Sequence, residues 1–193
     1  MTNPYLEESD CIDRRHPLVA AKAAELAAGA ADRVEIARRC FEFVRDEIRH
    51  SWDFRQNPVT CRASEVLAHG TGYCYAKSHL LAALLRANGI PAGLCYQRLS
   101  RGAGGPPYCL HGLNAVWLEG HGWYRIDPRG NKPGVDAQFA PPLERLAFPI
   151  LGADEYDLPG VLTRPLPEVV RVLTTCATVA EVYEHLPDAE LPA

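Results

Sequence analysis

A helix with glycine on both sides, followed at once by strands, is the feature that most constrains how this chain can fold. Residues 74–88 contain neither glycine nor proline. Gly72 interrupts the chain just before this segment, and Gly89 followed by Ile90-Pro91 ends it. Apolar residues recur along the segment at helical spacing, namely Leu80, Leu81, Leu84 and Leu85. The pattern predicts a helix with an apolar stripe, connected directly to a sheet.

Helices are expected before this segment and strands after it. Pro17 suits a first helical position and begins one expected helix. Asp32 with Glu35 resembles a capping box and begins a second helix, which reaches roughly residue 49. A short helix is expected at residues 63–69. Strands are expected at residues 93–99, 108–118 and 123–127, the last two joined as a hairpin. Helices first and a strand meander second predict an α+β fold with an antiparallel sheet.

The length of 193 residues suits a single domain covering residues 1–193. Its core is expected at about residues 32–131. Residues 132–193 are expected to be extended covering chain followed by C-terminal helices, since prolines are frequent over 131–167. Residues 168–173 are compatible with a helix, and Thr178 with Glu181 resembles a second capping box.

Charge and cysteine usage exclude several classes of function. The formal net charge of −4 predicts binding neither to nucleic acid nor to an anionic membrane. The first ten residues lack the features of a signal peptide, and no apolar run approaches the ~18 residues that a membrane helix needs. The seven cysteines include no C-x-x-C pair, and the pair Cys109 and His111 lacks further ligands at a recognisable spacing. We therefore expect free thiols, a cytoplasmic location, and neither metal nor cofactor.

Cys74 is the cysteine best placed for chemistry, because it follows Gly72-Tyr73 and begins the predicted helix. Unpaired N–H groups and the positive end of the helix dipole lower the pKa of a thiol at such a position. The same N–H groups can stabilise an oxyanion when a thiolate attacks a carbonyl group. Cysteine is also a common core residue, so the position alone leaves a purely structural role open.

A cysteine nucleophile needs a base, and His111 lies on a strand of the predicted hairpin. If Trp117 pairs with His121 across a three-residue loop, His111 lies directly opposite Asp127 on the same face of the sheet. A two-residue turn would instead put the two on opposite faces. The spacing fits a histidine–aspartate pair and an unrelated pair of turn residues equally well.

Several segments, taken together, resemble the transglutaminase-like superfamily within the papain-like cysteine enzymes. They are Gly72-Tyr73-Cys74, the Leu84 to Ala92 run with its Gly-Ile-Pro-Ala ending, the His111 strand, and Asp127-Pro128. The resemblance covers roughly residues 60–131 and implies that a helical half carrying the nucleophile packs on an antiparallel sheet. It also implies Cys74 as nucleophile, His111 as general base and acid, and Asp127 as the residue that orients His111, with no cofactor. Gly112-Leu113 and Gly93 depart from common family residues and leave the substrate subsite open.

The leading hypothesis is acyl transfer from an amide or peptide substrate through a thioester on Cys74, with hydrolysis favoured over transamidation. A non-catalytic peptide-binding module is the alternative, and acetyl transfer from a thioester donor is a third reading without a supporting nucleotide motif. Tyr73, Tyr75 and Trp123 flank the predicted site and are expected mainly to pack. The resemblance does not identify a second oxyanion donor, because His50, Trp52 and Asp53 lie upstream of Cys74 but match no family position. The Gly/Pro loop at 102–107 is a candidate rim of the cleft. The oligomeric state is not predicted.

Overall fold

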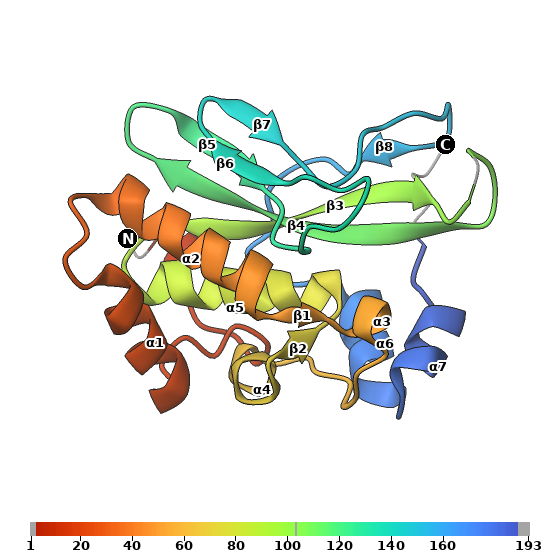
Figure 1. Cartoon of the computed structure of the whole chain (residues 1–193), viewed down its shortest axis with the longest axis horizontal. Helices are drawn as coiled ribbons and strands as arrows, with labels where there is room; N and C mark the ends of the chain where they lie inside the picture. The colour runs from red at the N-terminus through yellow and green to blue at the C-terminus, as the bar shows by residue number, and fades with distance from the viewer. Residues whose placement is uncertain (1–2, 103, 189–193) are drawn as a thin grey trace.

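Helix α5 (Cys74–Ala87) lies at the centre of the protein, between the other helices and the sheet (Figure 1). The computed structural model describes residues 3–102 and 104–188. Every residue of α5 from Cys74 to Arg86 is buried, so the helix is enclosed on all sides rather than along one stripe. The predicted apolar stripe was therefore too narrow, because sequence periodicity registers the leucines but not the polar residues that are buried with them.

The other helices lie mainly on one side of α5, and the main sheet lies on the other (Figure 1). The helices are α1 (Pro17–Ala27), α2 (Arg33–Glu47), α3 (Ser51–Phe54), α4 (Ala63–His69), α6 (Pro167–Thr175) and α7 (Val179–Glu184), with a 3₁₀ turn at Pro4–Leu6. The strands are β1 (Arg49–His50), β2 (Thr71–Gly72), β3 (Ala92–Ser100), β4 (Tyr108–Leu118), β5 (Gly122–Ile126), β6 (Gln138–Ala140), β7 (Leu143–Arg145) and β8 (Tyr156–Asp157). The main sheet is antiparallel with the order β5-β4-β3-β8, which confirms the predicted α+β class.

Local sequence signals determine where the helices begin and end. Pro17 is the first residue of α1, and the Asp32 side chain accepts a hydrogen bond from the N–H of Glu35 at the start of α2. The Glu35 carboxylate accepts from the N–H of Ala31 rather than of Asp32, so the predicted capping box is only half formed. Gly70 ends α4 in the left-handed conformation, with φ of 63°. These boundaries agree with the sequence prediction to within about two residues.

The hairpin of β4 and β5 has a different register from the one predicted. Trp117 pairs with Trp123 and Leu118 with Gly122, so the loop is Glu119-Gly120-His121. The register is shifted by two residues, and a shift of two keeps every side chain on its predicted face. Pairing ends at Asn114 and Ile126, so Asp127 lies just beyond β5. His111 and Asp127 are therefore diagonal rather than direct neighbours, which is close enough for contact.

The segment predicted as extended covering chain, residues 131–167, contains short strands as well. Strands β6 and β7 form a small hairpin, and β8 adds to the edge of the main sheet beside β3. Such two- or three-residue strands carry no periodic pattern, because their pairing depends on the sheet edge they meet.

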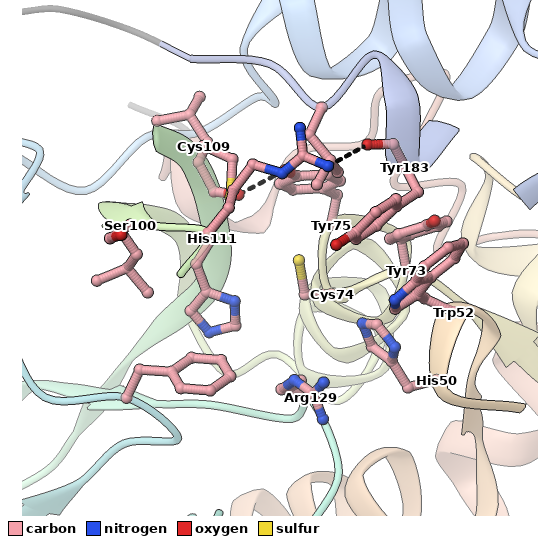
Figure 2. A pocket seen from close by; sticks show the side chains of 15 residues that line it. His50, Trp52, Tyr73, Cys74, Tyr75, Ser100, Cys109, His111, Arg129 and Tyr183 are labelled. Carbon is pink, nitrogen blue, oxygen red and sulfur yellow. Dashed lines mark hydrogen bonds between the residues drawn. The ribbon is translucent and has the colours of Figure 1, made fainter. Parts of the chain in front are cut away.

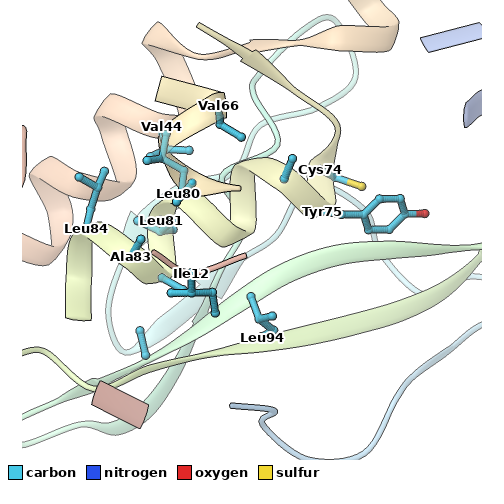
Figure 3. Close-up of a cluster of buried hydrophobic side chains, with 14 of the residues drawn as sticks. Ile12, Val44, Val66, Cys74, Tyr75, Leu80, Leu81, Ala83, Leu84 and Leu94 are labelled. Carbon is cyan, nitrogen blue, oxygen red and sulfur yellow. The ribbon is translucent and has the colours of Figure 1, made fainter. Parts of the chain in front are cut away.

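Buried side chains of α5 connect it to both ends of the chain. The Arg86 guanidinium donates to the carbonyl oxygens of Ala92, Glu7 and Thr163 at 2.7–2.9 Å. On the helix side, Leu80 and Leu84 lie near Val44 and Val66, while Leu94 of β3 covers the sheet side (Figure 3). The hydrophobic cluster around α5 includes residues from Cys11 to Val182.

Gly112 of β4 permits the close approach of the sheet to the beginning of α5. A Cβ atom at this position would lie 2.9 Å from Cδ1 and 3.2 Å from Cα of Tyr75. Tyr75 is buried, and its hydroxyl donates to the carbonyl oxygen of Leu110 at 2.5 Å. The strand and the helix therefore have no room to accommodate a larger residue here.

Gly112→Ala is expected to lower the free energy of unfolding by about 1–3 kcal/mol, because overpacking forces β4 and α5 apart. Urea denaturation of both proteins measures this difference. Gly105→Ala is the matched control, since a Cβ at Gly105 meets no atom within 4 Å among the described residues. Equal losses in the two variants would contradict the proposed close approach.

Candidate active site

Cys74 is the first residue of α5, and the chain before it is tightly held. Gly72 in β2 pairs with His50 in β1, and a Cβ at Gly72 would lie 3.2 Å from Cβ of Ala76 and 3.3 Å from Oγ1 of Thr60. Tyr73 precedes the helix without a side-chain capping hydrogen bond. The first N–H groups of α5 therefore have no partner within the helix and surround the position of the thiol.

His111 of β4 forms a buried pair with Asp127. The distance from His111 Nε2 to Asp127 Oδ2 is 2.7 Å, and the aspartate is fully buried. The backbone N–H of Ala147 donates to Oδ2 at 3.0 Å and that of Arg129 donates to Oδ1 at 3.1 Å. The edge-to-face ring of Phe148, at 5.0 Å between centroids, packs on the imidazole. The carboxylate is thus fixed by three hydrogen bonds and orients His111.

The charges of this pair determine its protonation. Burial alone lowers the pKa of His111, but the charge of Asp127, its hydrogen bond, and hydrogen bonding and charge from Cys74 outweigh burial and raise it to about 10. Burial opposes ionisation of Asp127, yet the charge of His111 and the hydrogen bonds to the carboxylate hold its pKa below the usual value. The pair is therefore an imidazolium and a carboxylate at neutral pH.

The structure brings together the three residues predicted from the sequence. Cys74 and His111 line the same cleft, and they lie beside each other in Figure 2. His111 Nε2 faces Asp127, which leaves Nδ1 for the side of Cys74. The catalytic roles of Cys74, His111 and Asp127 remain predictions.

The cleft has a volume of about 260 Å³, and its walls are mainly aromatic and apolar. Tyr73 and Tyr75 line it, although each is buried and each hydroxyl donates to a backbone carbonyl oxygen. Trp123 does not line it; this ring packs against Tyr5 and Trp117 instead. At one end, the rings of Trp52 and Tyr183 stack with 3.7 Å between centroids.

One rim of the cleft includes Ser100 and Arg101, next to the predicted Gly/Pro loop at 102–107. The Arg101 guanidinium donates to the carbonyl oxygen of Tyr183 at 2.9 Å and so joins this rim to α7. Ala103 of the loop lies outside the described residues. The part of the loop that follows is connected back to β3, because the N–H of Gly105 donates to Oγ of Ser100.

His50 is a cleft residue that the sequence did not identify. It lies at the end of β1 and lines the same cleft as Cys74 and His111 (Figure 2). Burial and the positive charge of Arg129 hold the pKa of His50 well below its usual value, so its ring is neutral. The sequence carries no signal that places His50 at the cleft. Strand β1 has only two residues, and it reaches the site through its pairing with β2.

Arg129 is a second missed residue, and it connects Asp53 to Asp127. Its backbone N–H donates to Asp127, and its guanidinium pairs with Asp53 at 2.8 Å. Asp53 also pairs with Lys132 at 2.8 Å. Burial opposes the charge of Asp53, but the hydrogen bonds from Arg129 and Lys132 lower its pKa to about 2. This ionic cluster fixes the turn after β5, and with it Asp127.

Replacing Asp127 with asparagine is expected to lower the pKa of His111 by more than one unit, because burial then acts without the opposing negative charge. In the wild type, the protonated ring stabilises the folded state fully below pH ~6.5, and this contribution is lost as the pH rises through about 10. Imidazole NMR signals of His111 across the pH range measure both midpoints. Unchanged midpoints would contradict the ion pair.

Comparisons with known proteins agree with this fold. The family model described as the transglutaminase-like superfamily matches residues 20–128. A candidate cysteine protease from Cytophaga hutchinsonii shares the fold with a TM-score of 0.53 and 17% identity, over 65% of this chain and 41% of that one. No curated protein matches the chain.

Two further solved structures are similar to this chain. The periplasmic domain of TgpA from Pseudomonas aeruginosa has a TM-score of 0.48 and 22% identity, over 64% of this chain and 45% of that one. A transglutaminase from red sea bream has a TM-score of 0.45 and 15% identity, over 61% of this chain and 27% of that one. The chain thus spans less than half the length of each of these structures. Because the family model covers more than half of the chain, the protein belongs to the transglutaminase-like superfamily.

Proposed function

We propose that the protein is a cysteine-dependent acyl-transfer enzyme that acts on an amide bond through a thioester on Cys74. The observation that carries this proposal is the buried His111–Asp127 pair beside a cysteine at the first position of a helix. The superfamily typically consists of enzymes, among them cysteine proteases and transglutaminases. Membership therefore agrees with a catalytic role, while the reaction itself is our inference.

The proposed reaction begins with attack by the Cys74 sulfur on the carbonyl carbon of an amide. A protonated His111 beside the sulfur stabilises the thiolate that attacks. The negative charge then develops on the carbonyl oxygen. We assign its stabilisation to the backbone N–H of Cys74 and to an N–H of the neutral His50 ring.

Collapse of the tetrahedral intermediate breaks the carbon–nitrogen bond and requires a proton for the leaving amine. His111 supplies this proton and becomes neutral, and Asp127 keeps the ring in the orientation needed. Neutral His111 then removes a proton from the acceptor, which attacks the thioester. The thiolate and the imidazolium are restored when the acyl group leaves.

Hydrolysis is the outcome we favour, because water is the acceptor present without a dedicated binding site. A cleft of about 260 Å³ accommodates a side chain or a short acyl group. The apolar and aromatic walls favour the uncharged part of a peptide or amide substrate. Transamidation requires an amine bound at the same place, and no feature among the described cleft residues favours one.

A non-catalytic peptide-binding module is the second candidate, supported by the same cleft.

The described part of the chain, residues 3–102 and 104–188, contains no helix long and apolar enough to cross a bilayer. A cytoplasmic location stays a proposal based on the seven free cysteines. We do not propose binding to nucleic acid, because the net charge of the chain is −4.

Cys74 is expected to react with iodoacetamide at least about tenfold faster than the other cysteines at pH ~6, because a neighbouring imidazolium favours the thiolate. Peptide mapping by mass spectrometry measures the rate at each cysteine. Cys109 and Cys176 serve as internal controls, since both are partly exposed and neither begins a helix. Asp127→Ala should lower the iodoacetamide rate of Cys74 to that of the two control cysteines.

Similar rates at all three thiols would contradict an activated nucleophile. If Cys74→Ala then also bound a peptide with wild-type affinity while neither protein turned it over, the binding module would be the correct reading. Detection of a thioester adduct on Cys74 with an amide substrate would instead exclude that reading.

His50→Ala is expected to lower kcat about 100- to 1000-fold, because one donor to the developing oxyanion is lost. His50→Gln keeps an N–H donor of similar reach and should retain a larger share of kcat. The two kcat values are compared with the iodoacetamide rate of Cys74, which does not involve an oxyanion and should change little. A parallel loss of labelling in both variants would indicate a structural role for His50.

A further inference from the structure

Two cysteines and a histidine meet on the helical side of the protein, away from the cleft. Cys11 precedes α1, Cys61 precedes α4, and His79 lies on α5. The two sulfur atoms are 3.5 Å apart, and one ligand atom from each of the three residues lies within 4.8 Å of the others. All three side chains are buried. The three segments thus converge on one small volume.

Within the described part of the chain, His79 has one ring nitrogen that is bonded and one that is not. Its Nδ1 lies 2.8 Å from the carbonyl oxygen of Cys61, so Nδ1 carries the proton and donates. Nε2 is then an unprotonated nitrogen, and it has no hydrogen-bond partner among residues 3–102 and 104–188. A buried acceptor without a partner costs free energy, so it calls for an explanation.

The backbone holds the cluster in place independently of any ligand. The N–H of Ala63 donates to the carbonyl oxygen of Cys11 at 2.9 Å, which joins the two cysteine-bearing segments. Ile12 is fully buried in the main hydrophobic cluster. The guanidinium of Arg86 donates to the carbonyl oxygen of Glu7 at 2.7 Å. The N-terminal segment is therefore fixed against α4 and α5 on both sides of Cys11.

We propose that Cys11, Cys61 and His79 bind a thiophilic divalent cation, Zn²⁺. With zinc–sulfur bonds of about 2.3 Å, sulfur atoms 3.5 Å apart subtend an angle of about 100° at the metal, close to the tetrahedral value. Binding converts two thiols to thiolates and releases two protons, so the buried centre is electrically neutral. The proton on Nδ1 remains with the Cys61 carbonyl, as is usual for a metal-binding histidine.

Two other readings of the cluster leave His79 unexplained. A hydrogen bond between the thiols satisfies Cys11 and Cys61 but gives Nε2 no partner. A disulfide between Cys11 and Cys61 would also leave Nε2 of His79 without a partner among the described residues. A cation uses all three groups at once, and soft thiolate ligands with an imidazole suit zinc.

The cation has a route to the cluster and a structural consequence. Cys11 lines a surface groove together with Ser9, Asp10 and Arg164. A cation bound by Cys11, Cys61 and His79 would link the N-terminal segment to α5, the helix that begins with Cys74. Sequence spacing gave no indication of this site, because the three ligands come from separate segments without a recognisable ligand motif.

Cobalt(II) titration of the reduced, chelator-treated full chain tests the proposal. All proteins carry Cys74→Ala, so that the thiol beside His111 cannot contribute a ligand. We expect one Co²⁺ per chain with a thiolate-to-metal charge-transfer absorption, displaced by Zn²⁺. Cys11→Ala should weaken binding more than about 100-fold, since loss of a group that only hydrogen-bonds to a metal ligand already costs about 10- to 100-fold.

Cys40→Ala is the matched control, because Cys40 is also buried but contacts Asn88 rather than the cluster. It should bind Co²⁺ with unchanged affinity. Zn²⁺ at about 100-fold excess over its Kd should raise Tm by about 5–10 °C, and Cys11→Ala should abolish this rise. Circular dichroism verifies that Cys11→Ala is folded.

A cobalt spectrum without the charge-transfer band would overturn the proposal. Equal affinity in folded Cys11→Ala and Cys40→Ala would overturn it as well. A metal-free protein in which mass spectrometry finds Cys11 and Cys61 joined as a disulfide, and which binds no Co²⁺ after reduction, would assign the pair to redox chemistry instead. Each readout is independent of catalysis, so failure here and failure of the proposed enzymatic function are distinguishable.

Discussion

The complete burial of α5 is the constraint on which the rest of the structure depends. A helix enclosed on all sides can bury long cationic side chains only where carbonyl oxygens inside the protein accept their hydrogen bonds. Lys77 donates to the carbonyl oxygens of Arg45 and Ile48, and Arg86 donates to three further carbonyl groups. These bonds fix the helix against both chain ends. They therefore also fix the position of its first residue, Cys74, relative to the sheet.

The pair of His111 and Asp127 depends on the same packing. Two buried charges are stable only when their geometry is good and their remaining hydrogen-bonding groups are satisfied. Here the carboxylate receives two backbone N–H groups and the imidazole, and the ring is enclosed by Phe148. Because Gly112 follows His111, the strand approaches the first turn of α5 closely enough for the ring to lie beside Cys74. The absence of a side chain at 112 is thus as important to the site as the residues that carry the chemistry.

The sequence predicted those parts of the fold that local chemistry determines. Glycine and proline residues placed the ends of α1, α4 and α5, and a capping residue placed the start of α2. The register of the hairpin was wrong by two residues, yet His111 and Asp127 still share a face because side chains alternate with a period of two. His50 and Arg129 were missed because they reach the cleft through tertiary contacts, namely the pairing of β1 with β2 and the ion pair with Asp53. No spacing in the sequence carries that information.

The two proposed sites lie on two different faces of helix α5. Five residues separate Cys74 from His79, which corresponds to about 140° around the helix axis. The cysteine therefore faces the sheet and the cleft, while the histidine faces the N-terminal segment and Cys61. A rigid helix transmits a restraint from one face to the other, because its backbone hydrogen bonds allow little independent movement of neighbouring turns. A cation bound by His79, Cys11 and Cys61 would thereby restrain the turn that carries Cys74 without contacting the substrate.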